Sequence, residues 1–205
     1  MRRRVFDVIA STGGLLVAVV LIVAGALGLW AANWTNTNVR SQLAQQQIYF
    51  PPASAFAHAK AGTEITPNMR QYLYQYAGQQ VLNGAQAEAY ADHFIGQHLY
   101  DMPFHGVYSK VSAAARAAKA GSPQATQLQG LEATVFQGTT LRGLLLEAYG
   151  FSQFGVIALW ASIISFILAG LMLVLVGFGF WHSRRTKADE EILKMQSASA
   201  QQIAA

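Results

Sequence analysis

The residues best suited to chemistry lie in one run from Asp92 to His105, which holds three histidines and two carboxylates within fourteen positions. Histidine nitrogens and carboxylate oxygens are common ligands of zinc and other transition metals. His98 and Asp101 are three residues apart and would converge on one face of a helix, while His105 would fold back after a break at Pro103. These three residues are therefore candidate metal ligands. The alternative is a helix end with polar caps and interfacial histidines.

A second candidate is the carboxylate of Glu147, which stands on an apolar stretch a few residues before a long apolar run. Arg142 lies five positions before it. A charge removed from water needs compensation. Glu147 therefore either lies in water at the level of the lipid headgroups or pairs with a basic residue of a partner protein, and both interpretations stay open on the sequence alone.

Other catalytic patterns are absent from the sequence. No serine occupies a nucleophile elbow, no glycine-rich loop precedes a helix in a phosphate-binding arrangement, and no spaced pair of carboxylates suits acid–base catalysis. The chain contains no cysteine, which excludes disulfides, cysteine-ligated zinc and a thiol nucleophile. We therefore expect a protein that is not an enzyme and that carries no cofactor.

Two long apolar runs frame the region that holds these candidates. The second run, from Phe154 to Trp181, contains no charged residue. As a helix it would be about 42 Å long, against the roughly 30 Å hydrocarbon core of a bilayer. The first run, from Val8 to Ala32, follows a basic N-terminus, as a secretory signal also would, but it is too long for one. Both runs are predicted to be transmembrane helices.

Basic residues predict the orientation of these helices. Arginines at positions 2–4 precede the first run and the segment HSRRTK follows the second. Since basic flanks stay on the cytoplasmic side of the cell (inner) membrane, both termini are predicted to be cytoplasmic. The resulting segments are a basic cytoplasmic N-terminus (1–7), a first span (8–32), an extracytoplasmic domain (33–153), a second span (154–181) and a cytoplasmic tail (182–205).

The composition favours the same placement. Hydrophobic residues make up 53% of the chain and charged residues 12%, the latter about half of the usual share in soluble proteins. The net charge of +4 comes from residues beside the apolar runs, so it indicates membrane topology and not nucleic-acid binding. The expected partners are membrane lipids and other membrane-protein subunits.

Small residues recur at four-residue spacing in both predicted spans, a pattern that lets helix backbones approach closely in lipid. They are Gly14 with Ala18, Ala24 with Gly28, and the series Ala161, Ser165 and Ala169. These faces either pack the two spans against each other or receive a helix of another protein.

The region between the spans shows helical periodicity and no strand-like alternation of useful length. Capping signals mark three helix starts: Thr66-Pro67, Asn83 with Gln86, and Ser109. Two further helices are expected over 123–137 and 140–150. The predicted fold class is all-α, with two transmembrane helices flanking an all-helical extracytoplasmic domain.

Three segments carry a resemblance to a known family: YAGQQVLNGAQAEAYADHFIGQHL, YSKVSAAARA and LEATVFQGTTLRGLLLEAYGF. Over roughly residues 8–181 the chain resembles a widespread family of two-pass actinobacterial membrane proteins of unknown function. The resemblance implies an actinobacterial source and a two-pass topology. Some members are labelled aromatic ring-opening dioxygenases, enzymes that hold iron with two histidines and a carboxylate. Here the histidines crowd round one helix end, and the outer domain is too small to enclose that chemistry.

The leading functional hypothesis is a non-catalytic accessory subunit of a larger membrane complex, such as a transporter or a respiratory assembly. It would dock through its spans and its helical outer domain. The alternative is an extracytoplasmic module that senses a lipid, a metal or a small molecule. A cavity in the outer domain would favour the alternative, and stoichiometric partners in a gentle purification would favour the accessory subunit.

Overall fold

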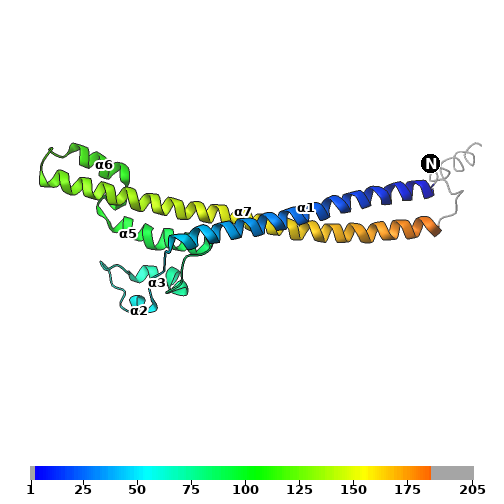
Figure 1. The fold of residues 1–205 in the computed structure, drawn as a ribbon, viewed down its shortest axis with the longest axis horizontal. Helices are drawn as coiled ribbons and strands as arrows, with labels where there is room; N and C mark the ends of the chain where they lie inside the picture. The colour runs from blue at the N-terminus through cyan, green and yellow to red at the C-terminus, as the bar shows by residue number, and fades with distance from the viewer. Residues whose placement is uncertain (1–2, 186–205) are drawn as a thin grey trace, which may run out of the picture. The chain divides into compact units, whose positions relative to one another are not determined.

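The computed structural model describes residues 3–185 and is built from helices (Figure 1). The α-helices are α1 (Arg3–Gln46), α2 (Ala53–Ala57), α3 (Pro67–Leu73), α4 (Gly84–Ala89), α5 (Gly96–Asp101), α6 (Tyr108–Ala117) and α7 (Pro123–Arg185). Short 3₁₀ turns cover Tyr74–Tyr76 and Pro103–Gly106, and a π-helical segment covers Tyr90–Ile95. Across residues 3–185 the β contact is a single bridge between Tyr49 and Gln80, so the all-α prediction is confirmed for this range. Most of the predicted cytoplasmic tail, from 186 onward, lies outside the described residues.

The chain forms two compact units. Among the described residues, the helix pair consists of 3–32 and 157–185, and the helical domain is Asn33–Val156. The helices expected over 123–137 and 140–150 are not separate, because α7 runs through both and through the second apolar run without a break. Both α1 and α7 hold a window that is long and apolar enough to cross a bilayer, with a mean hydropathy of 2.6.

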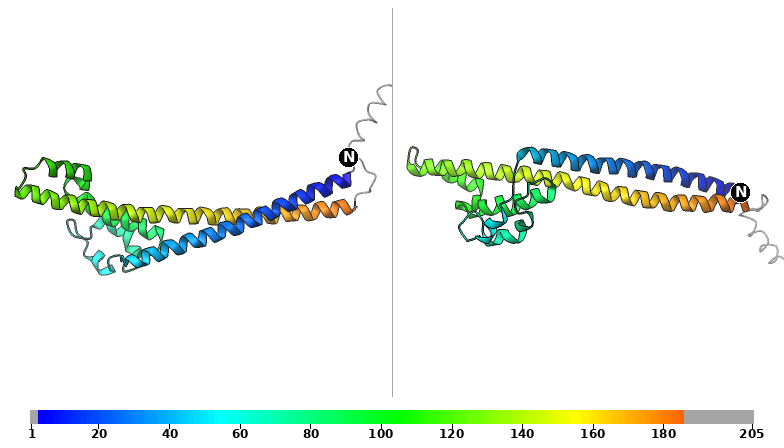
Figure 2. Two further views of the ribbon diagram at one scale, coloured as in Figure 1. Left: turned by 45° about the horizontal axis from the view of Figure 1, so that its top comes forward. Right: turned by 60° about the horizontal axis from the view of Figure 1, so that its bottom comes forward.

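Small residues line the seam of the helix pair, and the buried ones repeat every seven positions. They are Ser11, Ala18, Gly25 and Ala32 on α1, and Ser162, Ala169, Val176 and Ser183 on α7. A seven-residue repeat keeps one face of a helix turned to its neighbour, because two helical turns take close to seven residues. Gly14 approaches Val176 and Gly28 approaches Ser162, so the two helices run antiparallel. Both views of Figure 2 show them side by side over this unit.

The two backbones of the helix pair approach closely at Gly28. A Cβ atom there would lie 2.5 Å from Ser162 Oγ and 3.2 Å from the carbonyl oxygen of Ala158. Ser162 is 1% exposed, and its hydroxyl donates a hydrogen bond of 2.7 Å to the same carbonyl. The seam therefore depends on small residues, as expected for helices that associate in lipid.

Most of the predicted small residues lie in this seam. They are Gly14, Ala18, Gly28, Ser165 and Ala169. Ala24 and Ala161 are exposed instead, and the adjacent residues Gly25 and Ser162 take the buried positions. Four-residue steps drift across the face of a helix, whereas seven-residue steps follow it. Ala24 and Ala161 thus stay on the outer surface of the pair.

The helical domain has its own hydrophobic core. The largest buried cluster consists of Val39, Leu43, Phe50, Phe56, Ile65, Met69, Leu73, Val81, Ala87, Ala91 and Leu145. The ring of Phe50 packs against Tyr76 and Tyr90, with centroids 5.1 and 5.4 Å apart. Burial, and to a lesser degree the charge of Glu64, raises the pKa of Tyr90 above its ordinary value. A smaller cluster of Leu99, Val111 and Val135 joins α5, α6 and α7.

Local capping accounts for the start of α4 as predicted. The Asn83 side chain accepts a hydrogen bond of 2.9 Å from the N–H of Gln86, and the Gln86 side chain accepts a backbone N–H at 2.8 Å. Thr66 is the N-cap of α3, but its buried hydroxyl has no hydrogen-bond partner within the described part of the chain. The predicted cap at Ser109 was wrong, because α6 already begins one residue earlier.

Two irregular backbone segments flank α5. The π-helical segment Tyr90–Ile95 precedes it, and Phe104, His105 and Gly106 follow it with φ angles of 60°, 54° and 60°. A positive φ costs a residue with a side chain about 1–3 kcal/mol, and such outliers cluster at functional sites. Both segments overlap the run that holds the candidate metal ligands.

Replacing Gly106 with alanine is expected to destabilise the protein by about 2–4 kcal/mol, through a strained φ and a steric clash. The added Cβ atom would lie 2.5 Å from the carbonyl oxygen of Leu99. Gly121→Ala is the matched control, since Gly121 has a φ of 75° but no heavy atom within 4 Å of the added Cβ. It should lose only about 1–2 kcal/mol. Thermal unfolding of both variants in detergent, followed by circular dichroism, tests this, and equal losses would contradict the close approach.

Candidate functional site

The structure does not bring the three candidate metal ligands together. The Nδ1–H of His98 donates to the carbonyl four residues earlier at 2.7 Å, Asp101 accepts from Gln97 at 3.0 Å, and the Nδ1–H of His105 donates to the Tyr100 carbonyl at 3.1 Å. His98 and His105 line different hollows. In the range 3–185 no group of three histidine or carboxylate side chains could hold a metal ion. His98, Asp101 and His105 are instead bonded within their own helix end.

A charged hollow of about 390 Å³ lies beside α5. It is lined by Asp92, Gly96, Gln97, Leu99, Tyr100, His105, Gly106, Thr139 and Arg142. Nη2 of Arg142 donates to Oδ1 of Asp92 at 2.6 Å, which connects the π-helical segment to α7. The buried Nε of Arg142 has no hydrogen-bond partner among the residues that the structure describes. Arg142 is thus committed to Asp92 and not to Glu147, because residues five apart on a helix point about 140° away from each other.

An apolar hollow of about 450 Å³ lies on the same domain. It is lined by Glu64, Phe94, Ile95, His98, Leu99, Met102, Thr134, Gln137, Gly138 and Leu141. Leu141, one of the lining residues, is 50% exposed. Sequence periodicity did not reveal this hollow, because its lining comes from three segments (Glu64, 94–102 and 134–141) that are 30 or more residues apart in the chain.

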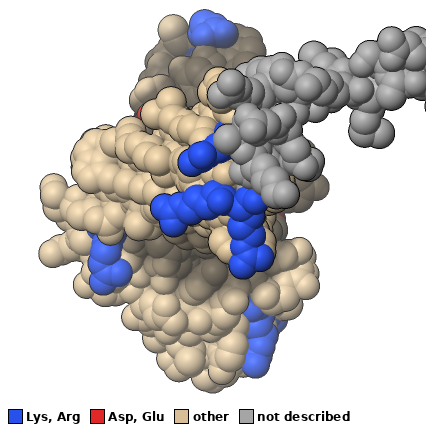
Figure 3. All heavy atoms as spheres, turned by 90° about the vertical axis from the view of Figure 1, so that its right-hand side faces the viewer, with Lys and Arg blue, Asp and Glu red and all other residues tan. Residues whose placement is uncertain are grey.

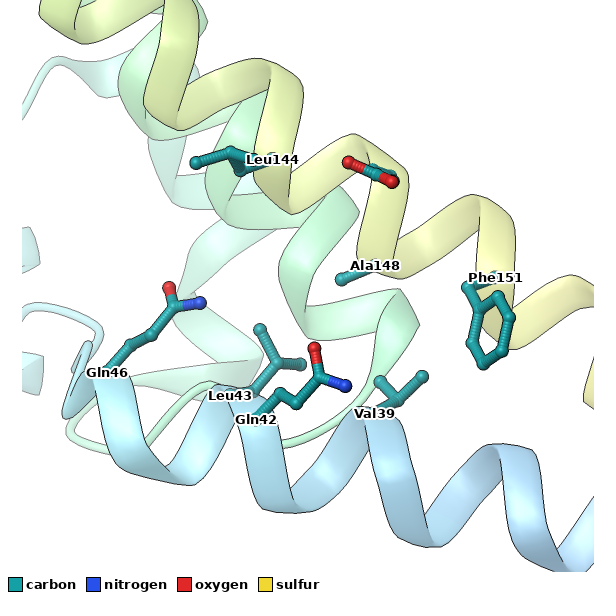
Figure 4. Close-up of a pocket in the computed structure, with 8 residues that line it drawn as sticks. Val39, Gln42, Leu43, Gln46, Leu144, Ala148 and Phe151 are labelled. Carbon is teal, nitrogen blue, oxygen red and sulfur yellow. The ribbon is translucent and has the colours of Figure 1, made fainter.

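Glu147 lies in a third hollow, of about 330 Å³, between the last turns of α1 and the middle of α7 (Figure 4). Its lining residues are Val39, Gln42, Leu43, Gln46, Leu144, Glu147, Ala148 and Phe151. Figure 4 shows the amides of Gln42 and Gln46 reaching from α1 towards α7, whose Leu144, Ala148 and Phe151 stand opposite. The hollow therefore combines an apolar floor with amides and one carboxylate.

The end of the helix pair at which α1 begins and α7 ends is basic. Arg184 and Arg185 lie in the last turn of α7, and Figure 3, which views this end, shows several basic side chains and almost no acidic surface. The Asp7 carboxylate lies 3.9 Å from His182 Nε2, and the Arg185 guanidinium lies over the ring of Trp181 at 4.2 Å. Tryptophan and arginine in this combination are typical of a membrane interface.

Comparison of the chain with protein-family models, with curated proteins and with solved structures gives no match. The resemblance to two-pass actinobacterial membrane proteins therefore stays a prediction. Two features of the structure bear on function: the apolar exterior of the helix pair and the hollows of the helical domain.

Proposed function

We propose that this protein is a two-pass membrane protein and a non-catalytic accessory subunit of a larger membrane complex. Its helix pair would anchor it in the bilayer, and its helical domain would dock on another subunit. The main evidence for a docking surface is the apolar hollow around Leu141, which lies outside the predicted span.

The exterior of the helix pair supports the bilayer placement. In the most apolar windows of α1 and α7 only 17% and 11% of the residues are buried. A helix in the core of a soluble protein would be mostly buried, and a signal sequence would lie at the N-terminus, so neither accounts for α7. Lipid is the solvent in which so many exposed apolar side chains are stable.

The charge distribution supports an orientation with both helix ends in the cytoplasm. Arg3 and Arg4 begin α1, and Arg184 and Arg185 end α7, so the basic residues gather at one end of an antiparallel pair. Basic residues next to transmembrane helices are retained on the cytoplasmic side. The helical domain would then lie on the outer face of the cell membrane.

The apolar hollow supports a protein partner. Leu141 precedes Phe154 by thirteen residues, which is about 20 Å of helix and places the hollow outside the hydrocarbon core. Lipid tails do not cover this surface, and exposed apolar surface in water marks interaction sites. An apolar helix or side-chain cluster of another subunit fits a hollow with this lining.

Replacing Leu141 with aspartate is expected to abolish the recovery of stoichiometric partners, because the charge would be buried without compensation in the interface. The full-length protein is purified through a C-terminal tag in a mild detergent, and partner subunits are quantified by mass spectrometry. Ala113→Asp is the matched control, since Ala113 is exposed on α6, and it should retain the partners. Recovery of the wild type as a lone monomer would contradict the proposal.

A second candidate function is a binding module for a small ligand, and the hollows of the helical domain favour it. A solidly packed domain would have counted against this function. If the wild type is recovered alone but co-purifies with a small molecule that Leu141→Asp loses, the apolar hollow is a ligand site and the accessory role is replaced.

A further inference from the structure

The hollow around Glu147 has the chemistry of a lipid-headgroup site. Its floor is apolar, with Leu43 2% exposed and Val39 5% exposed. Its lining also includes the amides of Gln42 and Gln46, which Figure 4 labels, and the carboxylate of Glu147. A pocket of this kind, mostly apolar with a few convergent polar groups, is the usual form of a small-molecule site.

The three polar groups of this hollow have no other partner among residues 3–185. Throughout the described part of the chain, Glu147, Gln42 and Gln46 make no side-chain hydrogen bond or ion pair. The nearest basic residue in the sequence, Arg142, donates to Asp92 instead. A carboxylate without a cationic partner, beside two unengaged amides, can therefore accept from an ammonium group while the amides donate to an anionic oxygen.

The position of the hollow along both helices matches the outer edge of a bilayer. Glu147 precedes Phe154 by seven residues, or about 10 Å of helix. The headgroup layer adds roughly 5–8 Å on each side of the hydrocarbon core, so the backbone of Glu147 lies at the water-facing limit of that layer. The rings of Phe151 and Trp34 meet edge to face at 6.1 Å beside the hollow, as aromatic residues at an interface do.

We infer that this hollow binds the zwitterionic headgroup of an amine-bearing phospholipid. The Glu147 carboxylate accepts hydrogen bonds from the ammonium group, and the amides of Gln42 and Gln46 donate to the phosphodiester oxygens. Phe151 offers its ring to the cation and to the methylene groups. The volume of about 330 Å³ suffices for a headgroup of about ten non-hydrogen atoms, because one water occupies about 30 Å³. This inference rests on the bilayer placement proposed above, and not on the partner subunit.

Native mass spectrometry of the full-length protein in a non-ionic detergent tests this inference. The protein is titrated with phosphatidylethanolamine, with phosphatidylglycerol, which lacks the amine, and with water-soluble glycerophosphoethanolamine. The wild type should retain phosphatidylethanolamine in preference to phosphatidylglycerol. Glu147→Gln should weaken the binding of phosphatidylethanolamine roughly fivefold and remove the preference. Glu132→Gln, a change of the same kind earlier on α7, should leave both unchanged.

Each other outcome overturns the inference in a distinct way. Equal retention of both lipids by the wild type, or an unchanged preference in Glu147→Gln, would show that the hollow is not a site for the amine-bearing headgroup. Displacement of the lipid by glycerophosphoethanolamine at equal concentration assigns the hollow to a soluble amine. A cross-link between Glu147 and a lysine of a co-purified subunit assigns the carboxylate to a protein partner. Release of the protein from membranes by alkaline carbonate contradicts the bilayer placement itself, so the two failures are distinguishable.

Discussion

Replacing Gly28 with leucine is expected to lower the melting temperature of the protein by about 6–10 °C, the shift that a loss of about 2–3 kcal/mol produces in a chain of this size. A Cβ atom at this position would lie 2.5 Å from Ser162 Oγ and 3.2 Å from a backbone oxygen of α7. Ser162 is bonded to that same oxygen and cannot rotate away without losing its partner. The helices must therefore separate to admit the side chain.

Helix propensity alone predicts the opposite result for Gly28→Leu, because leucine is a better helix former than glycine by roughly 0.5–1 kcal/mol. Gly13→Leu isolates this gain. Gly13 lies on the same helix, and an added Cβ atom there meets no heavy atom within 4 Å. This control should melt at or slightly above the temperature of the wild type. Similar melting temperatures for both variants would contradict the close approach of α1 and α7.

A disulfide gives a second and more direct readout of the helix pair. The chain has no cysteine, so an introduced pair is the sole source of cross-links. A Cβ atom at Gly179 would lie 3.4 Å from the Cβ atom of Ser11, near the roughly 3.5–4.5 Å separation found in disulfides. Ser11→Cys with Gly179→Cys should therefore cross-link on oxidation in membranes. Adding Gly28→Leu should reduce the yield, and adding Gly13→Leu should not.

The features that the sequence predicts correctly are those that depend on near neighbours in the chain. The length and apolar character of the long runs indicate helices wherever they pack. The bond from Asn83 to Gln86 forms within one helical turn, so its two residues suffice to predict it. Ser109 shows the limit of such a signal, since a serine near a helix start need not be its cap.

The features that the sequence did not predict depend on residues far apart in the chain, or on a choice between two similar spacings of small residues. The bond from Arg142 to Asp92 joins residues 50 positions apart. Pro103 predicts the break in the helix, but the positive φ angles of Phe104 and His105 are unexpected for residues with side chains, and only Gly106 among the three favours such an angle. The full seam of the helix pair could have been predicted from the sequence, because Ser11, Ala18, Gly25 and Ala32 are small residues spaced seven positions apart. The four-residue spacing found Gly14, Ala18, Gly28, Ser165 and Ala169, but it also selected Ala24 and Ala161, which the structure leaves exposed.

Gly84→Ala is expected to destabilise the protein by about 1–3 kcal/mol, since added atoms in a packed interface displace their neighbours. Gly84 opens α4 and is buried against α7. An added Cβ atom would lie 3.3 Å from the Cα atom of Tyr149 and nearer still to the side chain of Ser152. Ser152 is 7% exposed, and its hydroxyl donates to the Tyr149 carbonyl at 2.6 Å. Neither the backbone nor the bonded serine can move aside without disturbing α7.

The matched control for Gly84→Ala is Gly143→Ala in the middle of α7, where an added Cβ atom meets no heavy atom within 4 Å. There the substitution should raise stability by roughly 0.5–1 kcal/mol, because alanine is the better residue inside a helix. The two changes are chemically identical, so their opposite signs isolate the packing of α4 on α7. Thermal unfolding of both full-length variants in detergent, followed by circular dichroism, gives the comparison. If Gly84→Ala also raises the melting temperature, α4 does not pack on α7 at this distance, and the core of the helical domain is organised differently.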